Sequence, residues 1–120
     1  MNIYDNLNNL VKSIETSEEF LRYKQAAAAV DANPTYAQMA KDFITVQVQI
    51  STMQMLGQQP GSELIERFNT LYTSVSAIAC VNEFIQAQMQ FSRIMEDVSK
   101  ALSKAATLEY DFMKILPDQD

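Results

Sequence analysis

Apolar residues recur at spacings of three and four along almost the whole chain, and this rhythm constrains the fold more than any other feature. In the first run, Ile3, Leu7, Leu10 and Ile14 lie on one face of a helix. The 120 residues include only 2 Gly and 3 Pro, the residues that all-β folds use in their many tight turns. We therefore expect an all-α fold, a helical hairpin or bundle of about four to five helices.

Local signals predict where the first three helices begin and end. Thr16, with Glu19 three residues later, resembles a capping box, so a second helix is expected to start there. Asn33 is a favoured capping residue and Pro34 suits the first position of a helix, so a third helix should follow a break at this point. Gly57 is expected to end the third helix, because glycine adopts the left-handed conformation of a helix C-terminus without strain.

The second half of the chain contains two further predicted helices. Ser62 is expected to cap a fourth helix. Its apolar phase fails between Ser76 and Asn82, which predicts a break before a long last helix carrying Phe84 to Phe112. We expect one all-helical domain over residues 1–116 and a short tail over 117–120.

The third and last helices have the most regular apolar stripes, and the third repeats like a heptad seam. The stripe residues expected in the core or at an interface are Phe43, Val46, Ile50, Met53, Phe84, Phe91 and Ile94. A chain this short has more apolar helix face than one hairpin can cover. A homodimer formed largely through residues 36–56 and 84–108 is therefore expected.

Glutamine is enriched on the outer faces of these two helices. A glutamine amide makes hydrogen bonds without the desolvation cost of a charge, which suits a helix that contacts another protein, although it equally suits a plain polar surface. Methionine adapts to varied partners, and it also fills irregular cores. The candidates for a face that binds a protein partner are Gln47, Gln54, Met55, Gln88 and Met89.

Composition excludes several classes of function. A net charge of −6 without a basic cluster disfavours binding to nucleic acid or to an anionic membrane. The chain has no His, and the single Cys80 has no base to activate it, so we expect no catalytic, metal or cofactor site. A lone cysteine and the absence of a long apolar run indicate a cytoplasmic protein. The alternative is an enzyme or small-ligand carrier with an internal pocket.

The order and spacing of several short segments resemble the YlbF/YmcA family of small bacterial helical proteins, and its YheA-like branch in particular. These segments are Ile3-Tyr4-Asp5, Ser17-Glu18-Glu19-Phe20 with Tyr23-Lys24, Asp31-Ala32-Asn33, Asp42-Phe43 with Val46-Gln47, Gln54-Met55-Leu56-Gly57, and Glu83-Phe84 with Ala87-Gln88-Met89-Gln90-Phe91-Ser92.

This resemblance implies helical hairpins that pair into dimers and a regulatory role in competence, biofilm formation or sporulation. The best-known relatives are accessory subunits of a membrane-anchored ribonuclease, and they hold iron–sulfur clusters through clustered cysteines. This chain has only Cys80, so no such cluster is expected within one chain.

Overall fold

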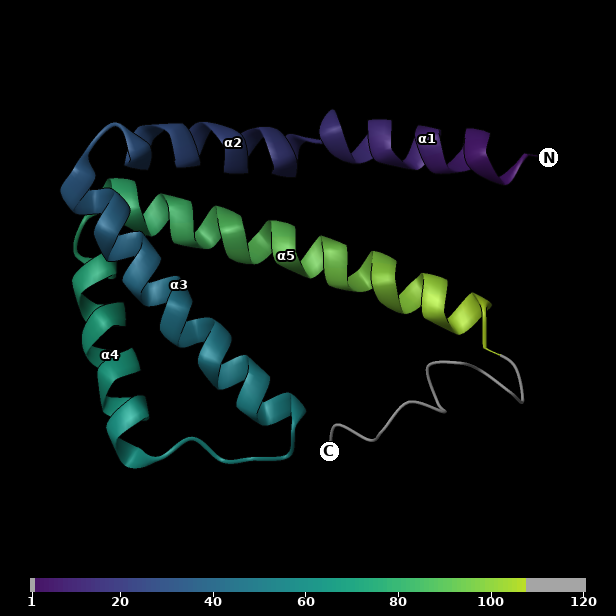
Figure 1. Ribbon diagram of the computed structural model, residues 1–120. Coiled ribbons are helices and arrows are strands. Elements are labelled where there is room, and N and C mark those ends of the chain that lie inside the picture. The colour runs from purple at the N-terminus through teal and green to yellow at the C-terminus, as the bar shows by residue number, and fades with distance from the viewer. Residues whose placement is uncertain (1, 108–120) are drawn as a thin grey trace.

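The computed structural model describes residues 2–107, which form five helices and no strand (Figure 1). The helices are α1 (Ile3–Glu15), α2 (Glu18–Asp31), α3 (Pro34–Met55), α4 (Ser62–Ser76) and α5 (Ala79–Ala105). The predicted all-α class and the predicted number of helices are confirmed.

The helices diverge from one corner of a flat molecule. The α2–α3 and α4–α5 connections both lie at that corner, and α1 continues outward beyond α2 (Figure 1). The radius of gyration is 17.7 Å and the principal extents are 47 × 37 × 16 Å, whereas a compact chain of this length has a radius of gyration of about 13.5 Å. Much of the helix surface is therefore left without a neighbour among the described residues.

The core is small and lies where α2, α3, α4 and α5 converge. Its buried members are Val30, Ala40, Phe43, Val75, Val81 and Ile85. Half-buried aromatic side chains extend this cluster, and Phe43 packs against Phe68 of α4 with ring centroids 5.3 Å apart. Aromatic pairs of this kind add to the stability that burial provides.

Polar and aromatic contacts hold α2 against α5. Arg22 on α2 donates hydrogen bonds to both carboxylate oxygens of Glu83 and to the side-chain oxygen of Gln90, both on α5. Next to this polar contact, the rings of Phe20 and Phe91 lie 5.2 Å apart. These contacts fix α2 antiparallel to the first half of α5.

Two predicted helix ends are confirmed in detail. Asn33 caps the start of α3, and its side-chain oxygen accepts a hydrogen bond from the backbone N–H of Thr35 at 3.0 Å. At the other end, Gly57 has a φ of 73°, and the backbone N–H of Gln58 donates to the carbonyl of Met53 at 2.8 Å. This is the hydrogen-bond pattern of a Schellman motif, which requires a residue that tolerates the left-handed region.

Two other predicted caps are wrong by one residue. Thr16 belongs to the end of α1, where its hydroxyl donates to a carbonyl of the last turn, and Ser17 instead caps α2 by accepting the N–H of Phe20. Ser62 lies inside α4, because the last extended residue is Gly61, and α4 has no side-chain cap. In both places a neighbouring residue takes the non-helical conformation that a cap needs.

The predicted break between the last two helices is confirmed but is shorter than expected. Only Ala77 and Ile78 separate the helices, so α5 begins at Ala79 and includes five residues before Phe84. The positions predicted for the end of this helix, Leu108 and Phe112, lie outside the described residues.

Candidate protein-interaction surfaces

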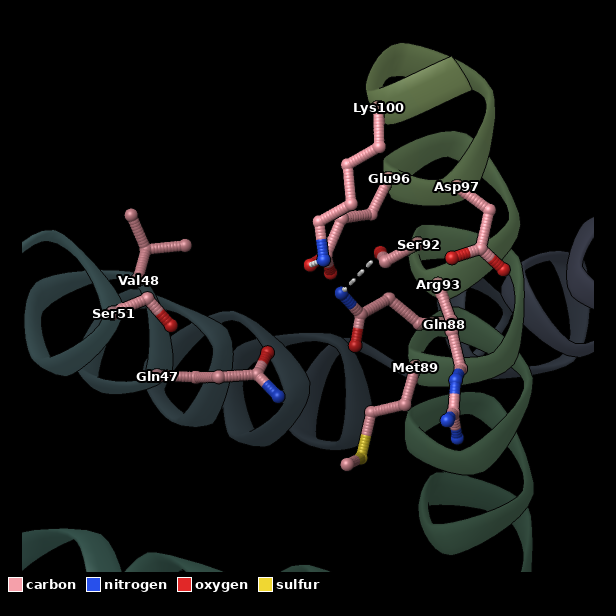
Figure 2. A pocket seen from close by; sticks show the side chains of 10 residues that line it. All are labelled: Gln47, Val48, Ser51, Gln88, Met89, Ser92, Arg93, Glu96, Asp97 and Lys100. Atoms are coloured by element: carbon pink, nitrogen blue, oxygen red, sulfur yellow. Dashed lines mark hydrogen bonds and ion pairs between the residues drawn. The ribbon is translucent and has the colours of Figure 1, made fainter. Parts of the chain in front are cut away.

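An open groove lies between α3 and α5 where the two helices diverge. Val46 and Ala87 are buried next to it, and the residues that follow each of them line a hollow of about 610 Å³. The lining residues are Gln47, Val48 and Ser51 of α3 and Gln88, Met89, Ser92, Arg93, Glu96, Asp97 and Lys100 of α5 (Figure 2). All of them are exposed or half-buried, so the hollow is a surface groove and not an enclosed pocket.

Two glutamines point into this groove from opposite walls. The side chains of Gln47 and Gln88 extend toward one another in Figure 2. The Gln88 amide nitrogen donates to the Ser92 hydroxyl at 3.2 Å, while its Oε1 is buried and accepts no hydrogen bond from the described residues. A buried acceptor without a donor costs free energy, and because this oxygen is closed off from solvent, a partner can donate to it only when the Gln88 side chain turns outward into the groove.

Charged residues line the α5 side of the groove. Glu96 and Lys100 form an exposed ion pair with a nitrogen–oxygen distance of 2.9 Å. Their hydrogen bond lowers the pKa of Glu96 and raises the pKa of Lys100. Arg93 and Asp97 also line the groove. This wall therefore carries two positive and two negative charges, and it favours neither an acidic nor a basic partner.

The α3 side of the groove carries no charge at all. No residue from Phe43 to Ser62 is charged, although Val48 is 55 % and Met55 72 % exposed. Charged residues are depleted at the centres of protein interfaces. An exposed stretch of helix without charge is therefore a candidate for a contact surface.

A second hollow, of about 410 Å³, lies on the other side of the outer half of α3. Its lining residues are Val48, Gln49, Thr52, Met53 and Leu64. Val48 lines both hollows and forms the ridge between them. The alternative function, an enzyme or small-ligand carrier, predicts an internal pocket. The residues that line these two hollows are exposed or half-buried, so both hollows are open surface sites.

The groove brings together three of the five residues predicted to face a partner. Gln47, Gln88 and Met89 line it, whereas Gln54 and Met55 are exposed further along α3. Their role in binding stays a prediction. Periodicity could identify the outer faces of α3 and α5, but it could not show that the two helices diverge and leave a hollow between them.

The predicted stripe residues lie mostly within the packing of a single chain. Phe43 and Val46 are buried, and Ile50, Met53, Phe84, Phe91 and Ile94 are half-buried. The ring of Phe43 packs on α4, while the ring of Phe91 packs on Phe20 and Tyr23 of α2. Each of the two stripes thus has its own partner helix, and these ring contacts do not join one stripe to the other.

A further exposed apolar surface lies on α1 and was not among the predicted sites. No residue of α1 is buried, and the exposed fractions are 79 % for Ile3, 73 % for Tyr4, 48 % for Leu7 and 43 % for Val11. The spacing of three and four had indicated an apolar face here. It could not indicate that the other described helices leave this face uncovered.

Potential metal ligands are not clustered in the described part of the chain. No group of three or more Cys, Asp or Glu side chains in residues 2–107 is arranged to hold a metal ion. Cys80 is half-buried and free. None of the helices in this part of the chain combines the length and hydropathy that a membrane span requires.

Comparison with known proteins gives one family match and several uncharacterised relatives. The family model described as control of competence regulator ComK, YlbF/YmcA, matches residues 3–107. A UPF0342 protein of Clostridium novyi is 31 % identical over 88 % of this chain and 92 % of its own length. UPF0342 proteins of Streptococcus gordonii (30 %, over 82 % and 88 %) and Caldicellulosiruptor saccharolyticus (26 %, over 96 % of both chains) are also similar.

Proposed function

The chain belongs to the YlbF/YmcA family, which is described by its control of the competence regulator ComK, and we propose that it is a non-enzymatic adaptor that acts by binding other proteins. Its role is then similar to that of the accessory factors of competence, biofilm and sporulation control. On the resemblance of its sequence segments, we place it in the YheA-like branch of the family.

The groove between α3 and α5 is the observation that carries this proposal. It joins an uncharged helix face to a wall of balanced charge, and it contains a buried Gln88 oxygen that needs a donor. A helix laid along the groove can fill it and, with the Gln88 side chain turned outward, supply that donor. We therefore assign partner binding to Gln47, Gln88 and Met89, with Gln54 and Met55 extending the contact along α3.

We also propose that the adaptor is a homodimer. The chain is flat, its core is small, and α1 has an amphipathic face with no buried residue. A second copy would cover apolar surface that costs free energy in water. The apolar stripes of α3 and α5 are largely packed against other helices of the same chain. The dimer must therefore also use surfaces outside these stripes.

A quantitative pull-down from cells that contain the protein tests the adaptor role. The tagged full-length chain is compared with Ser51→Arg, which places a bulky cation in the groove. The matched control is Ser74→Arg, which makes the same change on the exposed face of α4.

We expect the same partner proteins to be enriched by the parent and by Ser74→Arg, and to be depleted by Ser51→Arg. Recovery of nothing but the tagged chain itself would contradict the adaptor role. Equal recovery of every partner by all three proteins would show that binding occurs away from the groove.

A further inference from the structure

The first helix is an amphipathic element that, among residues 2–107, approaches no helix other than the adjacent α2. It has 13 residues, and an isolated helix of about this length is only marginally stable in water. Among the described residues α1 approaches only α2, the next helix in the chain. Its apolar side chains, including Leu7 and Val11, are therefore exposed at the positions where packing would normally stabilise a short helix.

The distal part of α5, residues 93–105, also exposes apolar side chains. Met95 is 39 % and Leu102 59 % exposed, and both lie on the side of α5 that carries Phe91. From the contact between Phe20 and Phe91 outward, α1 and the distal part of α5 run in the same general direction and move apart (Figure 1). Within residues 2–107, two neighbouring apolar helix faces of about 20 Å each are thus left exposed.

We propose that α1 of one copy packs against the distal part of α5 of a second copy, and that the second copy does the same in return. The two α1 helices and the two distal parts of α5 then form a four-helix bundle around a two-fold axis. Such an axis requires a self-complementary surface, and a chain that exposes both α1 and the distal part of α5 supplies both halves. This inference rests on the proposed homodimer and names the elements that hold it.

The charges of the two elements favour this pairing. Two chains with a net charge of −6 repel each other at long range. However, α1 has two acidic residues, Asp5 and Glu15, and one basic residue, Lys12. Residues 93–105 of α5 have three basic and two acidic side chains. The excess is negative on α1 and positive on the distal part of α5, so contact between them opposes the overall repulsion.

Cross-linking between single-cysteine chains tests the exchange of α1. In a Cys80→Ser background, one full-length chain carries Leu7→Cys and a second, with a tag of different mass, carries Leu102→Cys. Each chain then has one cysteine, so a disulfide between these two positions can form only between chains. In a parallel mixture, Val98→Cys replaces Leu102→Cys. Val98 lies one turn earlier on α5, so this mixture detects a contact that is shifted along the helix. The matched control replaces Leu7→Cys with Asn9→Cys, on the polar side of α1.

After mixing, mild oxidation and non-reducing electrophoresis, we expect a covalent heterodimer from Leu7→Cys with Leu102→Cys or Val98→Cys, and much less from Asn9→Cys. Light scattering on the same samples before oxidation measures the mass. A dimeric mass without the Leu7 cross-link would overturn the exchange of α1 while leaving the homodimer in place. A monomeric mass would overturn both, and equal cross-linking from Asn9→Cys would show that the apolar face of α1 is not the contact.

Discussion

The guanidinium of Arg22 on α2 donates two hydrogen bonds to the carboxylate of Glu83 on α5, from Nε to Oε1 at 2.6 Å and from Nη2 to Oε2 at 3.1 Å. This hydrogen bonding lowers the pKa of Glu83 and raises the pKa of Arg22, and the partial desolvation of each group acts in the opposite sense. Both side chains remain substantially exposed, so the pair orients α2 on α5 more than it stabilises the fold.

The Glu83–Arg22 pair predicts a small dependence of stability on pH. The folded-state pKa of Glu83 lies below its unfolded value, so its contribution is present at neutral pH and is lost as the pH falls through the folded pKa. Glu83→Gln should lower the melting temperature slightly at pH 7 and flatten its fall in acid. Thermal melts across the acid range check this, with Glu66→Gln, on an exposed position of α4, as the control. Identical acid profiles for Glu83→Gln and the parent would contradict it.

Phe43 is the core position whose truncation should cost most. It is 1 % exposed and packs against Phe68 and Tyr72 of α4. Phe43→Ala should lower the free energy of unfolding by about 3–5 kcal/mol, a large part of the roughly 5–15 kcal/mol typical of a domain. Phe91→Ala should have a smaller effect because Phe91 is half-buried. Chemical denaturation measures both.

The exposed Met55 provides the control for these core substitutions. It lies on the same helix as Phe43 and is 72 % exposed, so Met55→Ala should stay within about 0.5 kcal/mol of the parent. If Phe43→Ala unfolded at the same denaturant concentration as Met55→Ala, the packing of α3 on α4 described above would be wrong.

Helix positions could be predicted from the sequence because their signals are local. The spacing of apolar residues and the chemistry of Asn33-Pro34 and Gly57 act within a turn or two of the chain. The error at Thr16 arose because Ser17 is an equally good cap, and only the backbone conformation decides between adjacent candidates.

The partners of each helix face could not be predicted in the same way. Periodicity places Phe43 and Phe91 on apolar faces, but it does not reveal that Phe43 meets α4 and Phe91 meets α2. It also does not show that the apolar Val48 is exposed and lines both hollows. These outcomes depend on the angles at which the helices diverge, which are set by packing at the distant corner.

The two glycines provide a matched test of the turn that ends α3. Gly57 has a φ of 73°, whereas Gly61 has a φ of −69° and open space around its α-carbon. A side chain in the left-handed region costs roughly 1–2 kcal/mol. Gly57→Ala should therefore destabilise the protein by about that amount, while Gly61→Ala should cost less, because alanine adopts the backbone conformation of Gly61 without strain and loses only the N-cap preference for glycine. Equal effects in denaturant unfolding would mean that Gly57 does not hold this conformation in solution.

Gln88 is the position where stability and partner binding should separate. Its Oε1 is buried without a hydrogen-bond partner among the described residues, so Gln88→Met removes an unpaired acceptor while nearly preserving volume. We expect the free energy of unfolding to stay the same or rise, and partner recovery in the pull-down to fall, because the donor of the partner then meets an apolar side chain. Gln86→Met, on the opposite side of α5 and exposed, should change neither quantity. Normal recovery of every partner by Gln88→Met would show that its amide makes no contact that partner binding needs.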